Sequence, residues 1–344
     1  MHLCAILLTA SAAGQPAGEL PPSASGEHSL KLARQLLPMA RPHRTSRYVV
    51  LSDSQRPQIR GAERILEETR RQYDRWSRAM RSPIARPDDR LLCILFHDRA
   101  DFITFARHTE GLGETAEHVS GYFSSRFDWV VYFDPGGSDD IEQAARSLEE
   151  AAADIESARD RGADPDRVEE AAASVDALRA ELDAEEHARR TAVTIHEAVH
   201  QLIHVGTAFP GRANWPTWLH EGLAVAFETD AYRKPFGPDR DYARRANGFR
   251  DALREGRHMP LPAFLELETI DHAGTSHAGL IYDQAGSLVS WLYRRKRSEF
   301  GAFLEQAGIP DAQGNVPSVS TLFTEVIGSP ADIERRWHAD VLRR

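Results

Sequence analysis

The sequence predicts an α+β fold with strands in its first part and helices in its second. Apolar runs of strand length alternate with helical patterns before residue 135, whereas only helical patterns follow residue 216. Between these parts, the segment 138–190 contains no aromatic residue and predicts an inserted helical hairpin. These features are typical of a strand-rich N-terminal lobe joined to a helical C-terminal lobe.

The strands of the first lobe are predicted from short apolar runs. Residues 47–53 and 91–98 are two such runs, and 121–135 predicts a hairpin or two successive strands. Apolar residues spaced three and four apart predict a helix over 56–80, and a shorter helix is expected over 101–109. The first lobe therefore alternates strands with helices.

The inserted segment has helix start and stop signals at the places a hairpin needs them. Ser138 is a predicted N-cap, Gly162 ends the first helix, and Asp164-Pro165 begins the second. A solvated insertion with a thin apolar seam is the expected role for such an acidic, Ala-rich segment. A docking arm for a protein partner through 138–190 is the alternative.

The second helix of the hairpin has no evident end before the next lobe. No Gly or Pro interrupts residues 165–205, which predicts one helix of about 60 Å. A break near Arg189-Arg190 is the alternative. The remaining predicted elements are helices near 217–229, 240–256, 278–296, 299–307, 319–327 and 330–342.

The start of the chain resembles a secretory signal peptide. Residues 1–13 combine a short apolar run with small residues, and cleavage is expected near Ala12 or Ala13, although Lys and Arg are missing from the beginning. The Pro-, Ser- and Gly-containing residues 14–44 predict a linker, and 45–344 a single domain. We therefore expect an exported protein, periplasmic or extracellular.

Composition excludes several classes of function. The formal net charge of -10 argues against general nucleic-acid binding, which requires a basic surface. No later stretch approaches the roughly 20 apolar residues that a membrane-spanning helix needs. Of the two cysteines, Cys4 lies in the predicted signal and Cys93 in a predicted buried strand, so no cysteine-based zinc site is expected.

The segment 191–204 carries a metal-binding pattern. His196 and His200 are four residues apart, which places both imidazoles on one face of a helix, where they can reach one ion. Glu197 follows the first histidine in the H-E-x-x-H order of zinc hydrolases. The flanking residues are nearly all apolar, so a buried helix carries three polar groups that need partners.

A second apolar helix, predicted from Pro216 onward, contains another costly carboxylate. Glu221 lies within the string WLHEGLA, and burial of its charge requires a cation or hydrogen-bond donors. A zinc ion held by His196 and His200 would be such a cation. Gly222, its neighbour, permits close approach of another backbone.

HEAVH followed by WLHEGLA resembles the gluzincin zinc peptidases of the thermolysin-like superfamily. The resemblance covers about residues 191–228 and implies a zincin-like fold with one Zn²⁺ per chain. It implies His196, His200 and Glu221 as the metal ligands and Glu197 as the general base. Glu228 matches a position at which such peptidases often have an acidic residue, and a supporting role is expected for it.

Neighbouring histidines fit the pattern less well. The metzincin pattern is excluded because Ile203 and Gly206 stand where it requires Gly and His. His204 is one further turn along, too far to share an ion with His196, and is expected to be structural or at the edge of the cleft. His220 is an alternative ligand.

The resemblance also implies a mechanism. Glu197 would take a proton from a water activated by zinc, and the oxyanion formed would need a further donor. Tyr282 is the candidate for this donor, His277 is its rival, and a core position for Tyr282 is equally compatible with the sequence. Residues 128–134 are expected to form the edge strand along which substrate binds.

The function predicted from the sequence is therefore a zinc metallopeptidase that acts on peptides or proteins. One alternative is a metal-stabilised binding or scaffold protein that uses the helical arm. Another is a hydrolase of a non-peptide amide. Retention of Glu197 beside the three predicted ligands favours an enzyme, because a binding protein needs only the metal.

Overall fold

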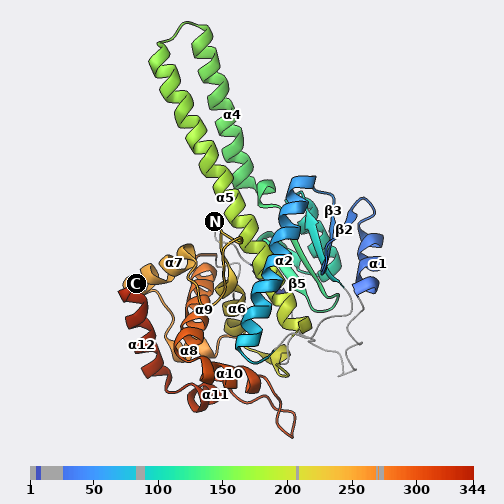
Figure 1. Cartoon of the computed structure of the whole chain (residues 1–344), viewed down its shortest axis with the longest axis vertical. Coiled ribbons are helices and arrows are strands. Elements are labelled where there is room, and N and C mark those ends of the chain that lie inside the picture. Colours follow the sequence, from blue (N-terminus) through green and yellow to red (C-terminus); the bar gives the residue numbers. More distant parts are fainter. Residues whose placement is uncertain (1–4, 9–25, 83–89, 207–208, 269, 271–274) are drawn as a thin grey trace.

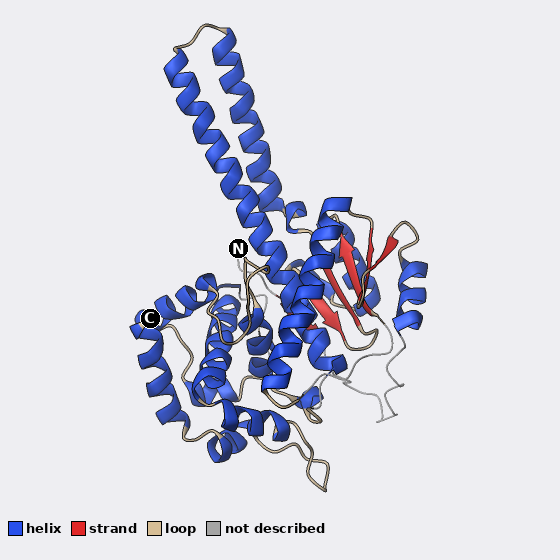
Figure 2. Cartoon of the chain, viewed as in Figure 1, coloured by secondary structure: helices blue, strands red, loops and turns tan. Residues whose placement is uncertain are grey.

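The computed structural model describes residues 5–8, 26–82, 90–206, 209–268, 270 and 275–344. A mixed sheet forms from the first part of the chain, a helical region from the last part, and a long helical hairpin projects between them (Figures 1 and 2). The predicted α+β class is confirmed. The expected cleavage positions, Ala12 and Ala13, lie outside the described residues.

The sheet has the strand order β1-β5-β6-β4-β3-β2. Strands β3, β4 and β6 are parallel to one another, β5 and β2 run antiparallel to their neighbours β6 and β3, and β1 is parallel to β5. Every residue of the three parallel strands is buried, which explains why they read as continuous apolar runs. The bounds are β1 Ala5–Leu8, β2 Arg41–Arg44, β3 Tyr48–Ser52, β4 Leu91–Phe96, β5 Gly121–Ser124 and β6 Trp129–Phe133.

Two expectations about the first lobe are wrong. The strand within 128–134 is not at the edge, because β6 lies between β4 and β5. The linker expected over 14–44 is in part structured: Gly26–Leu36 forms helix α1, and Arg41–Arg44 forms β2. Leu30 and Ala33 of α1 are buried, so this short amphipathic helix belongs to the core rather than to a linker.

Helices α2 (Arg56–Ala79) and α3 (Arg99–Phe105) are the other helices of the first lobe, with a π-helical turn over Ala106–Glu110 after α3. The apolar stripe of α2 packs against the long helix α5 and against β3. Both α2 and α3 lie where the sequence predicts a helix.

The hairpin consists of α4 (Asp139–Asp160) and α5 (Pro165–Gly206), and α5 is a single uninterrupted helix. Along its arm only Ile141, Val168 and Val175 are buried hydrophobic residues, which is the thin seam expected from the sequence. From Thr191 to Ile203, by contrast, every residue of α5 is buried. One helix thus has a solvated half and a core half.

The hairpin is fastened to the domain at its base by ion pairs. Arg189 contacts Asp140 across the two helices at 2.6 Å, and Glu185 accepts two hydrogen bonds from Arg244 of the second lobe. Pairs of this kind fix the angle at which the arm leaves the domain, although exposed pairs add little stability.

Among its described residues, the second lobe contains helices joined by loops and no strand. Its helices are α6 Thr217–Phe227, α7 Ala243–Arg254, α8 Leu261–Leu265, α9 Thr275–Arg295, α10 Arg297–Gln306, α11 Val319–Val326 and α12 Pro330–Arg343. All but the short α8 lie where the sequence predicts a helix. Within the described part of the chain, no helix combines the length and apolar character needed to cross a membrane.

Two glycines allow α6 and α9 to pack closely. A Cβ at Gly222 of α6 would lie 2.7 Å from the Ala285 carbonyl oxygen, and one at Gly286 of α9 would lie 2.3 Å from a methyl of Val225. The backbones therefore meet at a distance that no larger side chain allows. This contact fixes the position of Glu221, which precedes Gly222.

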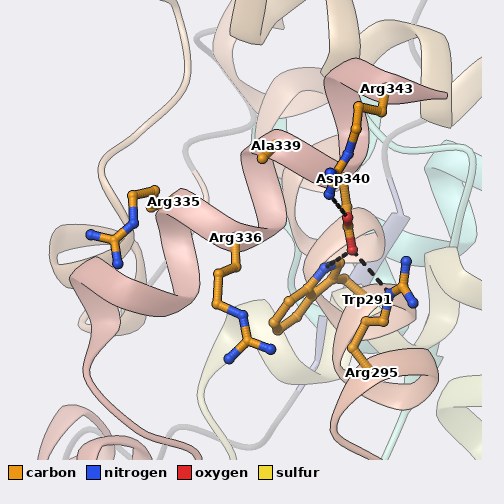
Figure 3. A pocket seen from close by; sticks show the side chains of 7 residues that line it. All are labelled: Trp291, Arg295, Arg335, Arg336, Ala339, Asp340 and Arg343. Carbon is orange, nitrogen blue, oxygen red and sulfur yellow. Dashed lines mark hydrogen bonds and ion pairs between the residues drawn. The ribbon is translucent and has the colours of Figure 1, made fainter.

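The last helix, α12, is fastened to α9. Trp291 and Arg295 of α9 both donate to the same carboxylate oxygen of Asp340 on α12, each at 3.0 Å (Figure 3). The Trp337 ring stacks on Phe249 of α7, with ring centroids 4.8 Å apart. The C-terminal helix is thus an integral part of the second lobe.

We predict that the outer part of the hairpin is dispensable for folding. Replacing 151–178 with a short Gly/Ser turn keeps the ion pairs at the base and removes few buried apolar groups. The shortened chain should be soluble, should unfold within a few degrees of the wild type and should bind as much zinc. Aggregation of the shortened protein, or a large drop in its thermal midpoint, would contradict this expectation.

Candidate metal centre

The buried half of α5 carries His196, Glu197 and His200. Apolar neighbours surround them on the helix, and their exposed fractions are 2%, 0% and 1%. The helix rise places the two imidazoles on one face, with ring centroids 4.8 Å apart at 72°. Three polar groups are thus held in the core by a helix that cannot turn them toward water.

Glu221 of α6 meets this face of α5. Its carboxylate oxygen lies 3.0 Å from Nε2 of His196 and 3.4 Å from Nε2 of His200, and the two Nε2 atoms are 3.0 Å apart. These atoms form a nearly equilateral triangle. Ligands at about 2.0–2.1 Å from a tetrahedral zinc ion are about 3.3–3.4 Å from one another, so the triangle fits such an ion closely.

Hydrogen bonding supports a cation in this triangle. Nδ1 of His196 lies 2.9 Å from an oxygen of Glu228, so in the neutral ring Nδ1 carries the hydrogen and Nε2 carries a lone pair. That lone pair faces the carboxylate of Glu221, and two such groups repel each other unless a cation lies between them. The donor set of two imidazoles and one carboxylate is one that zinc prefers.

The titration behaviour without metal leads to the same conclusion. Burial lowers the pKa of His196, but its hydrogen bonds to Glu221 and Glu228 outweigh burial and raise the pKa to about 10. Burial raises the pKa of Glu221, but the neighbouring His200 and His196 bring it well below the usual value. A proton thus takes the place of a cation in the metal-free centre, so metal and proton compete for it.

A buried charged network supports His196 from behind. Glu228, at the end of α6, accepts hydrogen bonds from Arg245 of α7 at 2.7 and 2.9 Å. Arg245 also donates to Asp283 of α9 at 3.1 Å. The network therefore joins three helices behind one ligand and fixes the orientation of its ring.

Carboxylates outnumber guanidinium groups among the described residues of this centre. Glu228 and Asp283 contact the guanidinium of Arg245, whereas Glu221 contacts His196 and His200. Burial raises the pKa of Asp283 to about 6 despite the opposing effect of Arg245, so Asp283 is still charged at neutral pH. The resulting excess of buried negative charge favours the binding of a cation.

Glu197 has a different environment from the ligands. Both of its carboxylate oxygens are buried and have no hydrogen-bond partner among the described residues. Burial raises the pKa of Glu197 well above its usual value. Gly121 of β5 packs under it, because a Cβ at Gly121 would lie 3.0 Å from Cγ of Glu197. The carboxylate of Glu197 is therefore buried beside the candidate ligands, with its stem against β5.

Tyr282 of α9 lies beside the centre. Its ring is fully buried, 5.9 Å from the ring of His196 between centroids and at 68° to it. The guanidinium of Arg245 is 5.9 Å from the Tyr282 ring. The structure thus brings Tyr282 to the predicted ligands, whereas the side chain of His277 lies outside the described residues.

The other two histidines do not belong to the ligand triangle. His220 points its ring toward Trp215, at 5.6 Å between centroids, and burial, followed by the nearby His200, lowers its pKa to about 3. His204 packs against Phe123 of β5. Both rings are neutral at physiological pH. They lie near the centre but do not belong to the group of candidate ligands.

Arg245 and Asp283 were missed in the sequence. Arg245 lies in the polar run ARRANGF, which reads as a solvated helix, and only its burial shows its role. A signal for Asp283 was present in the sequence, because it is a carboxylate inside the mostly apolar string GLIYDQAG. The same argument that selected Glu221 applies to it.

The part of the chain that carries the centre resembles one known family model. This model, described as a protein of unknown function (DUF1570), matches residues 190–310. That segment contains the buried half of α5 and helices α6 to α10, and so the candidate ligands, Glu197, Tyr282 and the charged network behind His196. No curated protein and no solved structure matches the chain.

A pocket elsewhere contains none of these residues. It has a volume of about 460 Å³ and lies between α9 and α12. Its walls are made by Trp291, Arg295, Arg335, Arg336, Ala339, Asp340 and Arg343 (Figure 3). The Asp340 carboxylate neutralises part of its positive charge through Arg295 and Arg343.

We predict that each of the variants His196→Ala, His200→Ala and Glu221→Ala contains one metal ion fewer per chain than the wild type. Loss of one ligand leaves two, which do not hold zinc against dilution. Metal analysis after gel filtration measures this. His220→Ala is the matched control, because it removes an equally buried imidazole from the same helix as Glu221. A full metal content in Glu221→Ala together with depletion in His220→Ala would move the third ligand to His220.

Proposed function

We propose that this chain is a zinc-dependent hydrolase and, more specifically, a gluzincin-like metallopeptidase with a zincin-like fold. The observation that carries the proposal is the carboxylate of Glu197, buried and unpartnered beside the triangle of His196, His200 and Glu221. A site that only binds a metal has no use for it. A site that removes a proton from water requires such a base next to the metal.

Zinc bound by the three ligands would supply a Lewis acid that polarises a carbonyl group and makes water more acidic. Glu197 then accepts the proton of the attacking water. In the metal-free centre, burial raises the pKa of Glu197 and favours the protonated form. The positive charge of a bound divalent cation would favour the ionised form, which is the form that accepts a proton. After attack, the same carboxyl group is placed to return the proton to the leaving amine.

The network behind His196 keeps the ligand in place during turnover. Glu228 accepts the Nδ1 hydrogen of His196, which fixes the tautomer with Nε2 free for the metal. Arg245 holds Glu228 by two hydrogen bonds and thereby keeps that carboxylate ionised. These residues position the ligand and do not touch the reacting atoms.

Tyr282 is the proposed donor to the oxyanion. It comes from a third helix, on the side of His196, and its phenol is neutral at physiological pH and donates without a change of charge. Hydrogen-bond donors fixed before the reaction stabilise the charge that develops in the transition state.

An extended peptide would bind along β5. This strand is antiparallel to β6 and runs past Glu197 at Gly121. Its other edge pairs with β1, with Ala5 opposite Gly121 and Leu8 opposite Ser124, which supports its capacity to accept an added strand. If residues 1–13 are removed as an export signal, as we propose, this edge becomes free for substrate.

Two other functions remain as alternatives. Hydrolysis of a non-peptide amide uses the same attack, and profiling against a peptide library with and without chelator separates it from peptidase activity. The Glu197→Gln variant tests the other alternative, a metal-stabilised binding protein, because binding through the hairpin does not depend on that carboxylate.

We predict that Glu197→Gln abolishes hydrolysis but keeps zinc. The amide has nearly the same shape and fits the same cavity, yet it cannot accept the proton of water. Turnover should fall by at least about two to four orders of magnitude, the usual contribution of a general base. Metal content and thermal midpoint, measured on the same preparation, should match the wild type. Undiminished turnover would remove Glu197 from the mechanism.

Tyr282→Phe should lower kcat about a hundredfold or more, because loss of one oxyanion donor typically costs that much. The variant keeps the ring that packs against His196, so KM and zinc content should stay near the wild-type values. Steady-state kinetics with the best peptide substrate measures both constants. A kcat close to that of the wild type would assign Tyr282 to the core.

A further inference from the structure

A second group of metal-ligating side chains lies on elements other than those of the first centre. It consists of His258, in the loop before α8, and Glu334 and His338, both on α12. One potential ligand atom from each residue lies within 4.8 Å of the other two. All three residues are partly buried, and none takes part in the chemistry proposed above.

The helix α12 and the loop that carries His258 are each held in a fixed position. Glu334 and His338 are four apart on α12, and this spacing puts both on one face of the helix, as it does for His196 and His200. The loop that carries His258 is clamped by Gln284 of α9, which accepts a hydrogen bond from Met259 N–H at 3.0 Å and donates to the Met259 carbonyl at 2.7 Å.

The two imidazoles have the geometry of the first centre. The rings of His258 and His338 are 4.7 Å apart at 85°, compared with 4.8 Å and 72° for His196 and His200. One nitrogen of each ring also belongs to the group of ligand atoms that lie within 4.8 Å of one another.

One ring nitrogen of each of these two histidines has no hydrogen-bond partner among the described residues. Nδ1 of His258 and Nε2 of His338 are both buried and accept or donate no hydrogen bond among the described residues. Buried polar atoms are costly when unpaired, and two of them beside a carboxylate are explained by a shared cation. Glu334 uses one oxygen to accept the Leu261 N–H at 2.6 Å, which leaves its other oxygen for an ion.

We propose that His258, Glu334 and His338 bind a second zinc ion. Two imidazoles and one carboxylate favour zinc over calcium or magnesium, which prefer oxygen ligands throughout. Three protein ligands leave a position for water, and the partial exposure of the group gives the ion access. The three ligand atoms lie within 4.8 Å of one another, so small side-chain rotations can bring them to one ion.

This second ion fastens the end of the chain to the lobe. It joins α12 to the loop that leads into α8, and Glu334 already contacts the first residue of α8. An ion that binds the folded chain and not the unfolded chain raises stability in proportion to the logarithm of its concentration. Zinc therefore stabilises the second lobe independently of catalysis.

The test is a zinc titration of the metal-stripped full-length chain against a competing chelating indicator. The wild type should bind two equivalents, and His338→Ala and Glu334→Gln should each bind one. Glu334→Gln is informative because its amide oxygen still accepts the Leu261 N–H, so the start of α8 is preserved. His118→Ala is the matched control, since His118 is exposed and outside both groups, and this variant should bind two.

The same zinc titration in the His196→Ala variant, which lacks a ligand of the first centre, separates this proposal from the first centre. His196→Ala should bind one equivalent, and His196→Ala combined with Glu334→Gln should bind none. The thermal midpoint of His196→Ala should rise with added zinc, and that rise should disappear in the combined variant. No zinc binding by His196→Ala, or an equivalent that survives both His338→Ala and Glu334→Gln in the His196→Ala background, would overturn the proposal.

Discussion

The structure depends on the burial of several charged groups at one point between α5, α6 and α9. Glu221, Glu228 and Asp283 are almost entirely removed from water, with one guanidinium to oppose them. Removing one partner from a buried pair typically costs about 3–5 kcal/mol, so such an arrangement persists only when its charges are compensated. A divalent cation bound by His196, His200 and Glu221 would provide that compensation, and the surrounding packing holds these three side chains close together.

The relative positions of these side chains are maintained by close backbone packing rather than by the polar groups themselves. Gly222 and Gly286 let α6 and α9 approach until side chains would collide, which fixes Glu221 and Tyr282 relative to each other. Gly121 does the same for β5 under Glu197. A methyl group at Gly222 or Gly286 would push α6 and α9 apart, and one at Gly121 would crowd Glu197. The glycines therefore control the distances between the elements that carry the candidate site residues.

The sequence predicts much of this because burial leaves a clear signal when the neighbours are apolar. His196, Glu197, His200 and Glu221 stand out as polar residues within apolar helices, and the structure brings all four together. Arg245 does not stand out, because its burial results from a tertiary contact with Glu228 that its polar neighbours conceal. The edge of the sheet was assigned wrongly for a related reason. Strand order follows from long-range pairing, and β5 and β6 are equally buried, so the two strands could not be distinguished by pattern.

Three consecutive residues of α9 connect the two groups of metal-ligating side chains, one around His196 and the other around His258. Successive side chains on a helix point about 100° apart, so Tyr282, Asp283 and Gln284 reach three different surroundings. Tyr282 faces His196, Asp283 binds Arg245, and Gln284 clamps the backbone of Met259 beside His258. A rotation or shift of α9 would disturb all three contacts together, and the close packing of Gly286 on Val225 prevents such a shift. The helix therefore acts as the rigid element against which both groups are positioned, one from α5 and α6 and the other from α12.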